Sequence, residues 1–423
     1  MFLDKQNLIN LIIFQFLLIT NFLIYIFNIN VIFVIINTGF IFILFFYLTL
    51  FKIHKELTYT KLTILILSII SLSSPLISMD GRGIWMFHAK RIFFDENIYA
   101  TFDNYLGMFQ NDYPTIITSF SASIAFFING WNEIFPKFAC LIFFIPPFLY
   151  LSLMFKNKMK QFLFCLMVLI ILEKKIIIGE MDALVSIYFL SIAIGLTNFS
   201  MNLSGPGKNL INHDLVFLFL NIFIFSLIKT ETIGIILIIM SLIITILIIK
   251  KVDKIKYLFF FTFSILSIFP WFFWKYKTSQ FVLKSTSSTW FDISLIYERI
   301  TDFSLYFKIF HLVLFNTHSI ISLLLFTVLL SKIKWNKINF LEINNNFQKS
   351  YELNIGLIIF ISSIFYLIVI FFGLMTSNFL YTSFNETGKN FFRYSLPVSF
   401  ALSFISIYLF DKTNLLYTSN TQS

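Results

Sequence analysis

Residues 8–28 read LINLIIFQFLLITNFLIYIFN, and residues 31–51 read VIFVIINTGFIFILFFYLTLF. Each run has the length that a helix needs to cross the hydrocarbon core of a bilayer. The runs are continuously apolar and lack the alternation of membrane-spanning strands, so helices are expected. The first run leads into the second without a small-residue cleavage site, which favours a retained helix over a signal peptide.

Similar runs recur along the whole chain of 423 residues, of which 58% are hydrophobic and only 12% are charged. A water-soluble chain of this length needs more polar surface to cover its core. We therefore expect an all-α, multi-pass membrane protein with about twelve transmembrane helices. The expected spans are residues 8–28, 31–51, 62–79, 137–155, 161–178, 183–200, 214–229, 232–250, 257–274, 311–331, 355–373 and 394–410.

A further apolar stretch, residues 114–129, is short and contains several Ser and Thr residues. We expect it to be a half-helix lying at one surface, because the charge pattern argues against a crossing. Lysines cluster in short loops between the spans, and these loops lie on one side only if this stretch does not cross. The loops are residues 52–61, 156–160, 250–256 and 332–350. The positive-inside rule identifies their side as the cytoplasm, and both termini join it.

The formal net charge of +10 could indicate nucleic acid binding in a soluble protein. Lysines in short cytoplasmic loops explain this charge more simply, so no nucleic-acid partner is expected. The remaining segments face outward and mix both signs of charge: residues 80–136, 173–182, 229–231, 275–310 and 374–393. They contain all the arginines of the chain, which are Arg82, Arg91, Arg299 and Arg393. Arginine is suited to a bidentate grip on phosphate or carboxylate.

Two aspartates stand next to helix ends in the first outer segment. Asp80 follows the span 62–79, at the depth where water meets the bilayer. A carboxylate there can act as a general base, and a helix cap or an exposed loop acid is the simpler alternative. Asp112 precedes Tyr113 and Pro114. Pro114 fits the first turn of the following half-helix, and Asp112 is placed to cap it.

Three later elements interrupt apolar sequence. One carries five charges: Glu173, Lys174, Lys175, Glu180 and Asp182. Such charges usually face a cavity or pair with one another. The second holds Lys229 and Glu231 between two spans, where an intramembrane ion pair is the structural alternative. The third is Arg393, at the start of the span 394–410. It is within reach of a lipid headgroup, or it serves as an interfacial anchor.

Metal and nucleotide motifs are missing from the sequence. Cys140 and Cys165 lie in apolar stretches and show neither metal-ligand spacing nor a disulfide framework, so they are expected to be small core residues. No HExxH, CxxC or phosphate-cradling glycine loop is present. The histidines lack ligand-like spacing, so we do not expect a structural metal.

Several short motifs follow one another along the outer segments. They are Asp80, then Ile84-Trp85, Ala89-Lys90, Asp112-Tyr113-Pro114-Thr115, Met181-Asp182, Lys229-Thr230-Glu231 and Arg393 with Pro397. This order resembles the GT-C superfamily of polyprenyl-phosphate-dependent glycosyltransferases. The superfamily includes protein O-mannosyltransferases and the aminoarabinose transferase of lipid A, and the chain is most similar to its uncharacterised bacterial members. The departures are Thr115 for a second proline, Met181 for alanine, a glycine displaced to Gly234, and two helices, where the family has one, before the span that leads to Asp80.

The resemblance implies a GT-C-like fold whose first outer loop bears short surface helices. The implied parts of a single membrane domain are an N-terminal helix pair (1–61), a catalytic core (62–274), an outer loop (275–310) and C-terminal helices (311–423). It also implies a hexosyl or pentosyl transferase of the bacterial cytoplasmic membrane, with its active site facing outward and a role in glycan biosynthesis of the cell envelope.

The reaction implied by the resemblance transfers a sugar with inversion from a polyprenyl phosphate to an acceptor hydroxyl. The acceptor is a glycan, a lipid or a protein, and membrane lipids surround the chain. Asp80 is the implied base, with Asp112 and Asp182 as further catalytic residues. The implied substrate- and phosphate-binding residues are Arg82, Lys90, Lys229, Glu231 and Arg393. Some members of the superfamily use a divalent metal and others do not, so metal dependence stays open.

The main alternative is a multi-pass transporter or lipid flippase. Such folds often show paired repeats and polar residues near the middle of the membrane. No repeat between the two halves is found in this sequence, and its charges cluster at outer helix ends. A structural or assembly subunit would not explain acids and arginines at several separate helix ends.

Overall fold

In the computed structural model, the described part of the chain is helical and contains no strand. The structure describes residues 5–52, 57–75, 78, 80–103, 111–155, 157–204, 213–249, 252–283, 292–314, 316–332, 351–376 and 392–410. Five helices in these ranges are long and apolar enough to cross a membrane. The protein is therefore all-α and membrane-embedded, as the sequence predicts.

The five long helices coincide with predicted spans. They are Lys5–Ile26, Val31–Thr49, Asp182–Met201, Lys254–Ser279 and Asn354–Gly373. Most of the other predicted spans overlap shorter apolar helices of 10–17 residues. A helix crossing the hydrocarbon core needs roughly 20 residues, so these shorter helices do not by themselves establish a crossing. The total of about twelve crossings stays a prediction.

The chain divides into two compact units. The first comprises Met1–Ser191, Ile211–Ile236 and Lys254–Trp290, and the second comprises Ile192–Leu210, Leu237–Asp253 and Phe291–Ser423. The predicted N-terminal helix pair belongs to the first unit, where it packs against helices of the predicted core.

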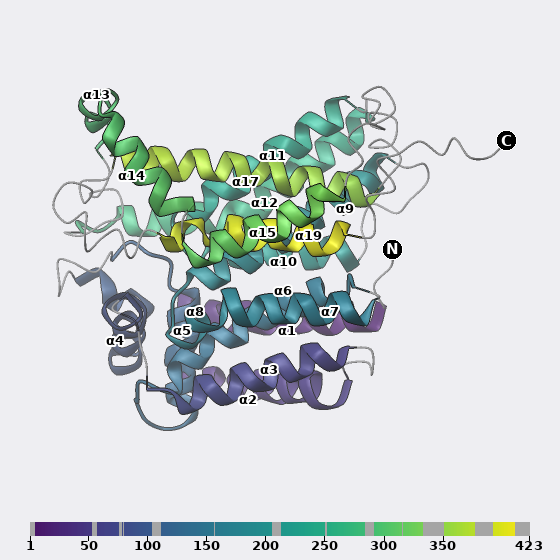
Figure 1. Ribbon diagram of the computed structural model, residues 1–423. Helices are drawn as coiled ribbons and strands as arrows, with labels where there is room; N and C mark the ends of the chain where they lie inside the picture. Colours follow the sequence, from purple (N-terminus) through teal and green to yellow (C-terminus); the bar gives the residue numbers. More distant parts are fainter. Residues whose placement is uncertain are drawn as a thin grey trace. The chain divides into compact units, whose positions relative to one another are not determined.

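The first unit is a bundle of helices with short helical segments at one end. Its helices are α1 (Lys5–Ile26), α2 (Val31–Phe46), η1 (Tyr47–Lys52), α3 (Thr58–Ser73), η3 (Gly81–Met86), α4 (Phe87–Asp95), η4 (Ile98–Asp103), α5 (Ile116–Phe127), η5 (Pro136–Phe138), α6 (Ala139–Ser152), α7 (Lys158–Ile171), α8 (Glu173–Ile177), α10 (His213–Ser226) and α12 (Lys254–Ser279). The first parts of α9 (Asp182–Ser204) and α11 (Thr232–Ile249) complete it. Figure 1 shows α1, α2, α3, α6 and α7 running roughly parallel.

The core of the first unit lies around α5 and α6. Every residue of α6 is buried. Cys140 in this helix and Cys165 in α7 are buried free thiols, as predicted from their apolar surroundings. The short helix α5 has 12 residues, too few to cross a bilayer. It packs among α1, α2, α4 and α6. Its serines bond to carbonyls of their own helix, as Ser121 does to Ile117, which allows polar side chains in an apolar interior.

The second unit contains α13 (Leu295–Arg299), α14 (Phe303–Leu314), α15 (Thr317–Ser331), α17 (Tyr351–Thr376), η8 (Phe392–Ser395) and α19 (Leu396–Leu409), together with the later parts of α9 and α11. Hydroxyl groups join α15 to α19. The Ser322 hydroxyl donates to the carbonyl of Ser399 at 2.7 Å, and the Ser403 hydroxyl donates to Ser322 at 3.0 Å. Small hydroxyl residues allow close helix packing in a membrane, where apolar burial alone does not hold helices together.

Three predicted boundaries are corrected by the structure. The span predicted at 161–178 is divided into α7 and α8, which meet at Leu172. The span predicted at 311–331 begins only at Thr317, because Asn316 caps α15 and residues 311–314 belong to the preceding helix. The outer loop predicted to begin at residue 275 begins later, because α12 continues to Ser279.

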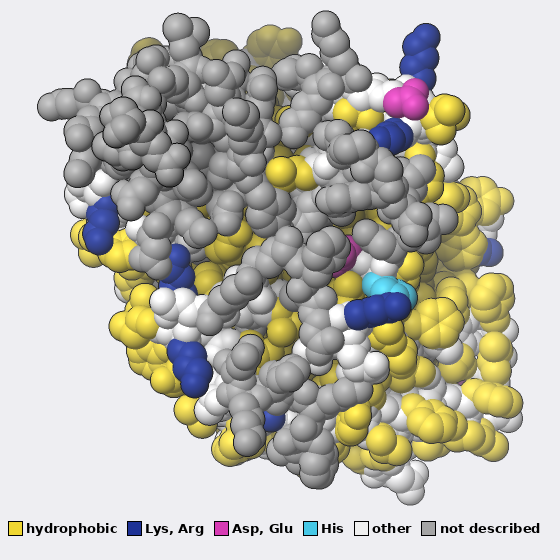
Figure 2. All heavy atoms as spheres, turned by 90° about the vertical axis from the view of Figure 1, so that its right-hand side faces the viewer, with side chains coloured by type: hydrophobic (Ala, Val, Ile, Leu, Met, Phe, Trp, Pro, Cys, Tyr) yellow, Lys and Arg dark blue, Asp and Glu magenta, His cyan; other side chains and the backbone are white. Residues whose placement is uncertain are grey.

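Charged side chains are visible at one end of the helices. Figure 2 shows the face turned to the right in Figure 1, and the described charged side chains on it are mostly Lys or Arg. In the first unit, Figure 1 places the end of α6 and the start of α7 toward that side, and α4, α5 and α8 at the opposite end. Which side of the membrane each end faces stays a prediction.

Candidate functional site

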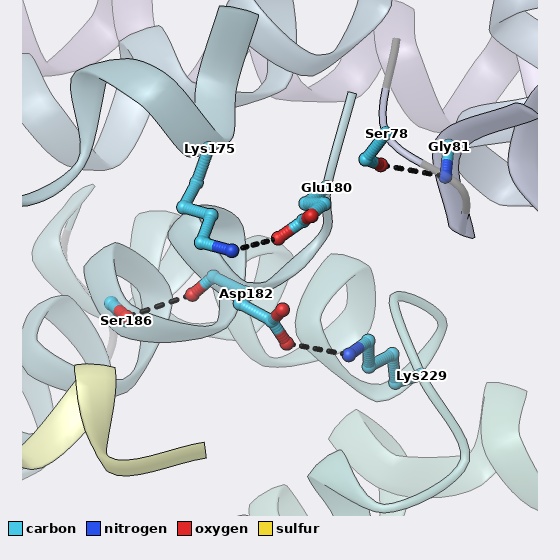
Figure 3. Close-up of polar contacts among 7 residues, drawn as sticks. All are labelled: Ser78, Gly81, Lys175, Glu180, Asp182, Ser186 and Lys229. Atoms are coloured by element: carbon cyan, nitrogen blue, oxygen red, sulfur yellow. Dashed lines mark hydrogen bonds and ion pairs between the residues drawn. The ribbon is translucent and has the colours of Figure 1, made fainter. Parts of the chain in front are cut away.

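Two ion pairs lie at the α4–α5–α8 end of the first unit. Lys229, in the turn between α10 and α11, places its Nζ 2.6 Å from Oδ1 of Asp182 at the start of α9 (Figure 3). Lys275 of α12 places its Nζ 2.8 Å from Oδ2 of Asp112. Both aspartates are buried. A charge in an apolar interior is costly unless it is paired. Each buried aspartate at this end of the bundle therefore has an ammonium group beside it.

A hydrogen bond joins two of the chain segments that carry these ion pairs. The Tyr113 hydroxyl donates to Oε1 of Glu231 at 2.8 Å. Tyr113 follows Asp112 in the chain, and Glu231 lies two residues after Lys229. The connected set will be called the polar network. Its members are Asp112, Tyr113, Asp182, Lys229, Glu231 and Lys275.

Side chains on the last turns of α12 donate hydrogen bonds to backbone carbonyls of the segments that form this network. The indole N–H of Trp274 donates to the carbonyl of Asp112 at 3.0 Å, and that of Trp271 donates to the carbonyl of Thr230 at 3.3 Å. Trp274 is completely buried. Trp271, Trp274 and Lys275 are spaced i, i+3, i+4, so they share one face of the helix. One helix face therefore fixes two loops that are far apart in the sequence.

The segment that carries Asp80 is attached to the network on two sides. The backbone N–H of Ser78 donates to the carbonyl of Ile178 at 3.0 Å, next to the α8–α9 turn. The Ser78 hydroxyl oxygen accepts from the N–H of Gly81 at 2.8 Å (Figure 3). Trp85 stacks on Tyr113, with ring centroids 5.3 Å apart. Asp80 itself is partly exposed at the start of η3, and its side chain does not cap that helix.

A third ion pair stabilises the α8–α9 turn beside Asp182. Lys175 pairs with Glu180, and both side chains are buried (Figure 3). Gly179 adopts a φ of +76° between them, in the left-handed region that glycine reaches most easily. The prediction that the charges of this element pair with one another holds for Lys175 and Glu180. Asp182 pairs with the α10–α11 turn instead.

Other predicted site residues lie elsewhere. The side chain of Arg82 is exposed, and its Nε lies 3.6 Å from a carboxylate oxygen of Glu133. Lys90 is exposed on α4. Arg393 lies in η8 of the second unit, and its side chain is outside the described residues. Of the predicted residues, the structure thus brings together Asp112, Asp182, Lys229 and Glu231.

Of the structural alternatives for these residues, the helix cap is wrong and the ion pair is found. Asp112 was placed to cap the helix after it, but Thr115 is the N-cap residue of α5 and no side chain caps it. Pro114 accordingly precedes the helix and is not in its first turn. The ion-pair alternative holds for Lys229, which pairs with Asp182, whereas Glu231 accepts from Tyr113.

Sequence reasoning missed Lys275 and the aromatic residues Trp271, Trp274 and Trp85 as members of the site. The sequence contains a signal for Lys275, Trp271 and Trp274. They end the apolar run 257–274 with a spacing that puts two indole N–H donors and one ammonium group on one helix face. No sequence signal identifies the partner of that face.

The chemistry available at this end combines carboxylates with ammonium groups in largely apolar surroundings. Such surroundings strengthen the attraction between an ammonium group and a developing negative charge on a bound molecule. Among the described residues, no three His, Cys, Asp or Glu side chains come together in a way that could hold a metal ion. Metal dependence therefore stays open, as it was from the sequence. Comparison of the chain with protein-family models, curated proteins and solved structures finds no significant match.

Proposed function

We propose that the protein is a membrane glycosyltransferase that takes its sugar from a polyprenyl phosphate. The observation that carries this proposal is the polar network. It joins acids and lysines from four separated stretches of the chain, in the same motif order that resembles the GT-C superfamily. Buried ionisable groups in membrane proteins are costly, and their default interpretation is functional.

The proposed reaction is a single displacement with inversion. The hydroxyl oxygen of the acceptor attacks the anomeric carbon, and the bond from that carbon to the phosphate oxygen breaks. Polyprenyl phosphate leaves with the bonding electron pair, and the Asp80 carboxylate takes the hydroxyl proton. Asp80 suits this role because it is partly exposed at the end of the bundle where the network lies.

Cations must stabilise the negative charge that develops on the leaving phosphate. Lys229 and Lys275 are the cations that the network brings into this region, each beside a buried aspartate. Their partners Asp112 and Asp182 position them. Arg82 and Lys90, exposed on the same outer segment as Asp80, complete the proposed set of phosphate-binding residues in the first unit. A phosphate-binding role for Arg393 stays a prediction from the sequence. The acceptor is proposed to be a glycan, lipid or protein at the outer face of a bacterial cytoplasmic membrane.

A transfer assay in membranes tests this function. Wild-type protein is incubated with a set of radiolabelled polyprenyl-phosphate sugars, and transfer to envelope acceptors is compared with that of Asp80→Asn. The matched control is Asp95→Asn, which makes the same change in an exposed ion pair on the same segment. We expect Asp80→Asn to abolish transfer and Asp95→Asn to retain it. Full activity of Asp80→Asn would rule out Asp80 as the base.

One observation favours the transporter alternative. Polar side chains meet inside the apolar bundle, where the Gln15 amide donates to Asn221 at 2.8 Å and the Asn221 amide donates to Ser191 at 3.4 Å. Polar groups inside membrane bundles can mark a substrate path, although they also hold helices together. A lipid-scrambling and uptake assay in proteoliposomes decides between them. Transport without any sugar transfer would favour the alternative.

A further inference from the structure

A segment of the second unit, Asp292–Leu314, contains the two short helices α13 and α14. It will be called the interface segment. The sequence placed most of it in an outer loop and the rest in a span. In the structure, α14 has 12 residues and α15 starts separately behind the cap of Asn316. At this length α14 is too short to cross a bilayer.

Hydrogen bonds attach the interface segment to the end of a membrane span. The Arg299 guanidinium donates from Nη1 to the carbonyl of Met375 at 2.8 Å, and the backbone N–H of Asp292 donates to the carbonyl of Thr376 at 2.8 Å. These carbonyls belong to the last turn of α17, where a helix leaves its oxygens without intrahelical donors. The apolar span Asn354–Gly373 ends just before them. The contacts therefore place the segment at the depth where the span leaves the hydrocarbon core.

One side of α14 packs against the same turns of α17. Leu305 is buried with Ile370 and Met375, and Tyr306 stacks on Phe371 with centroids 5.4 Å apart. Arg299 is 1% exposed. The position of the segment beside the end of α17, visible in Figure 1, is thus fixed by packing as well as by hydrogen bonds to backbone carbonyls.

The other side of the segment is apolar and exposed. The exposed fractions are 72% for Ile293, 82% for Tyr297, 56% for Ile300, 74% for Phe303 and 75% for Phe307. A group of large apolar side chains facing water is rare unless something covers it. Aromatic residues at the level of the headgroups are, in contrast, typical of membrane proteins.

Two observations identify lipid as the covering group. The segment packs on the end of α17, a helix that also exposes large apolar side chains, among them Phe365 and Phe372. Asp292 is exposed at the start of the segment. Hydrogen bonds from the Ser294 hydroxyl and backbone hold the pKa of Asp292 below its usual range, so this end stays charged. A charged edge next to an apolar, aromatic surface is the pattern of a helix lying in the bilayer interface.

We propose that the interface segment lies in the interfacial region of the bilayer and inserts Ile293, Tyr297, Ile300, Phe303 and Phe307 among phospholipids. This inference concerns the second unit and does not depend on the proposed glycosyltransferase function. It assigns the segment a role as a membrane-surface element that anchors the end of α17.

Site-specific fluorescence in lipid vesicles tests the inference. The full chain, with Cys140→Ala and Cys165→Ala, carries Phe303→Cys or Phe307→Cys labelled with an environment-sensitive nitrobenzoxadiazole probe. The matched control is Glu298→Cys, an exposed polar position in the same segment. Vesicles contain phospholipids with a nitroxide on an upper carbon of the acyl chain. If the cysteine-free background does not fold, the native background is used, and its two buried thiols supply the blank.

We expect blue-shifted emission and strong quenching by the nitroxide lipid at positions 303 and 307, and water-like, weakly quenched emission at 298. Water-like emission at all three positions would overturn the inference. Blue-shifted emission without lipid quenching would also overturn it, because a second copy of the chain or another protein would then cover the surface.

Discussion

The ion pair between Asp182 and Lys229 has little contact with water, since the two side chains are 7% and 13% exposed. Lys229→Met removes the cation and leaves the buried carboxylate without it, which costs about 3–5 kcal/mol when a buried pair is broken in this way. The double variant Asp182→Asn/Lys229→Met removes both charges and should recover most of that loss. Thermal unfolding of the purified protein in detergent measures both. A single variant as stable as the double variant would contradict the expectation.

Lys275 is the network residue that the sequence did not identify, and it is 29% exposed beside Asp112. If it stabilises the leaving phosphate, Lys275→Gln should lower the rate of sugar transfer about 10²-fold, the usual effect of removing one preorganised donor. Lys277→Gln is the matched control, because that ammonium lies over the ring of Phe273, 5.8 Å from its centroid. Equal losses in the two variants would indicate a general effect of charge and remove Lys275 from the site.

Single residues show what sequence can reveal about this site. Asp112, Asp182, Lys229 and Glu231 could be selected because charge is costly in an apolar chain, whatever its partner. Their partners could not be selected, because pairing depends on which helices are neighbours. Asp112 illustrates this limit. Its local sequence predicted a helix cap, but Lys275, 163 positions later, pairs with its carboxylate.

At the scale of one element, the α8–α9 turn places Glu180 and Asp182 through the conformation of Gly179. Its φ of +76° disfavours any side chain, although the nearest atom to an added Cβ would be 3.8 Å away. Gly179→Ala should therefore destabilise the protein by about 1–2 kcal/mol through backbone conformation and not through a clash. Gly130→Ala is the control, since an added Cβ there meets nothing within 4 Å. Chemical denaturation in detergent should show a loss for the first variant only.

Predicted elements differ from the observed ones where hydropathy and helix geometry diverge. The span 257–274 ended where apolar residues end, but α12 continues for another turn, so Lys275 remains on the helix. The prediction of a span at 311–331 rests on hydropathy and does not take account of Asn316. The side chain of Asn316 accepts from the N–H of Ser319 and caps the start of a new helix. Hydropathy detects apolar content, whereas caps and side-chain contacts decide where a helix begins and ends.

For the whole molecule, the helix α12 offers a direct test of orientation. It has 26 residues, which corresponds to about 39 Å of helix and exceeds the roughly 30 Å of a hydrocarbon core. Asp253 precedes it and Ser279 ends it, and both are exposed. The lysine loops predict that Asp253 faces the cytoplasm and Ser279 the outside. A membrane-impermeant maleimide should therefore label Ser279→Cys in intact cells, and Asp253→Cys only in inside-out vesicles.

The same labelling extends to the crossings that the shorter helices leave undecided. α7 and α10 have 14 residues each, about 21 Å, so each crosses only with help from flanking residues or a thinner bilayer. If α7 with α8, α9, α10 and α11 all cross, Asn157→Cys must be labelled from the same side as Asp253→Cys. Labelling from opposite sides would mean that an odd number of these helices cross. The lysine loops would then lie on both sides of the membrane, and the outward assignment of Asp182 and Lys229 would lose its basis.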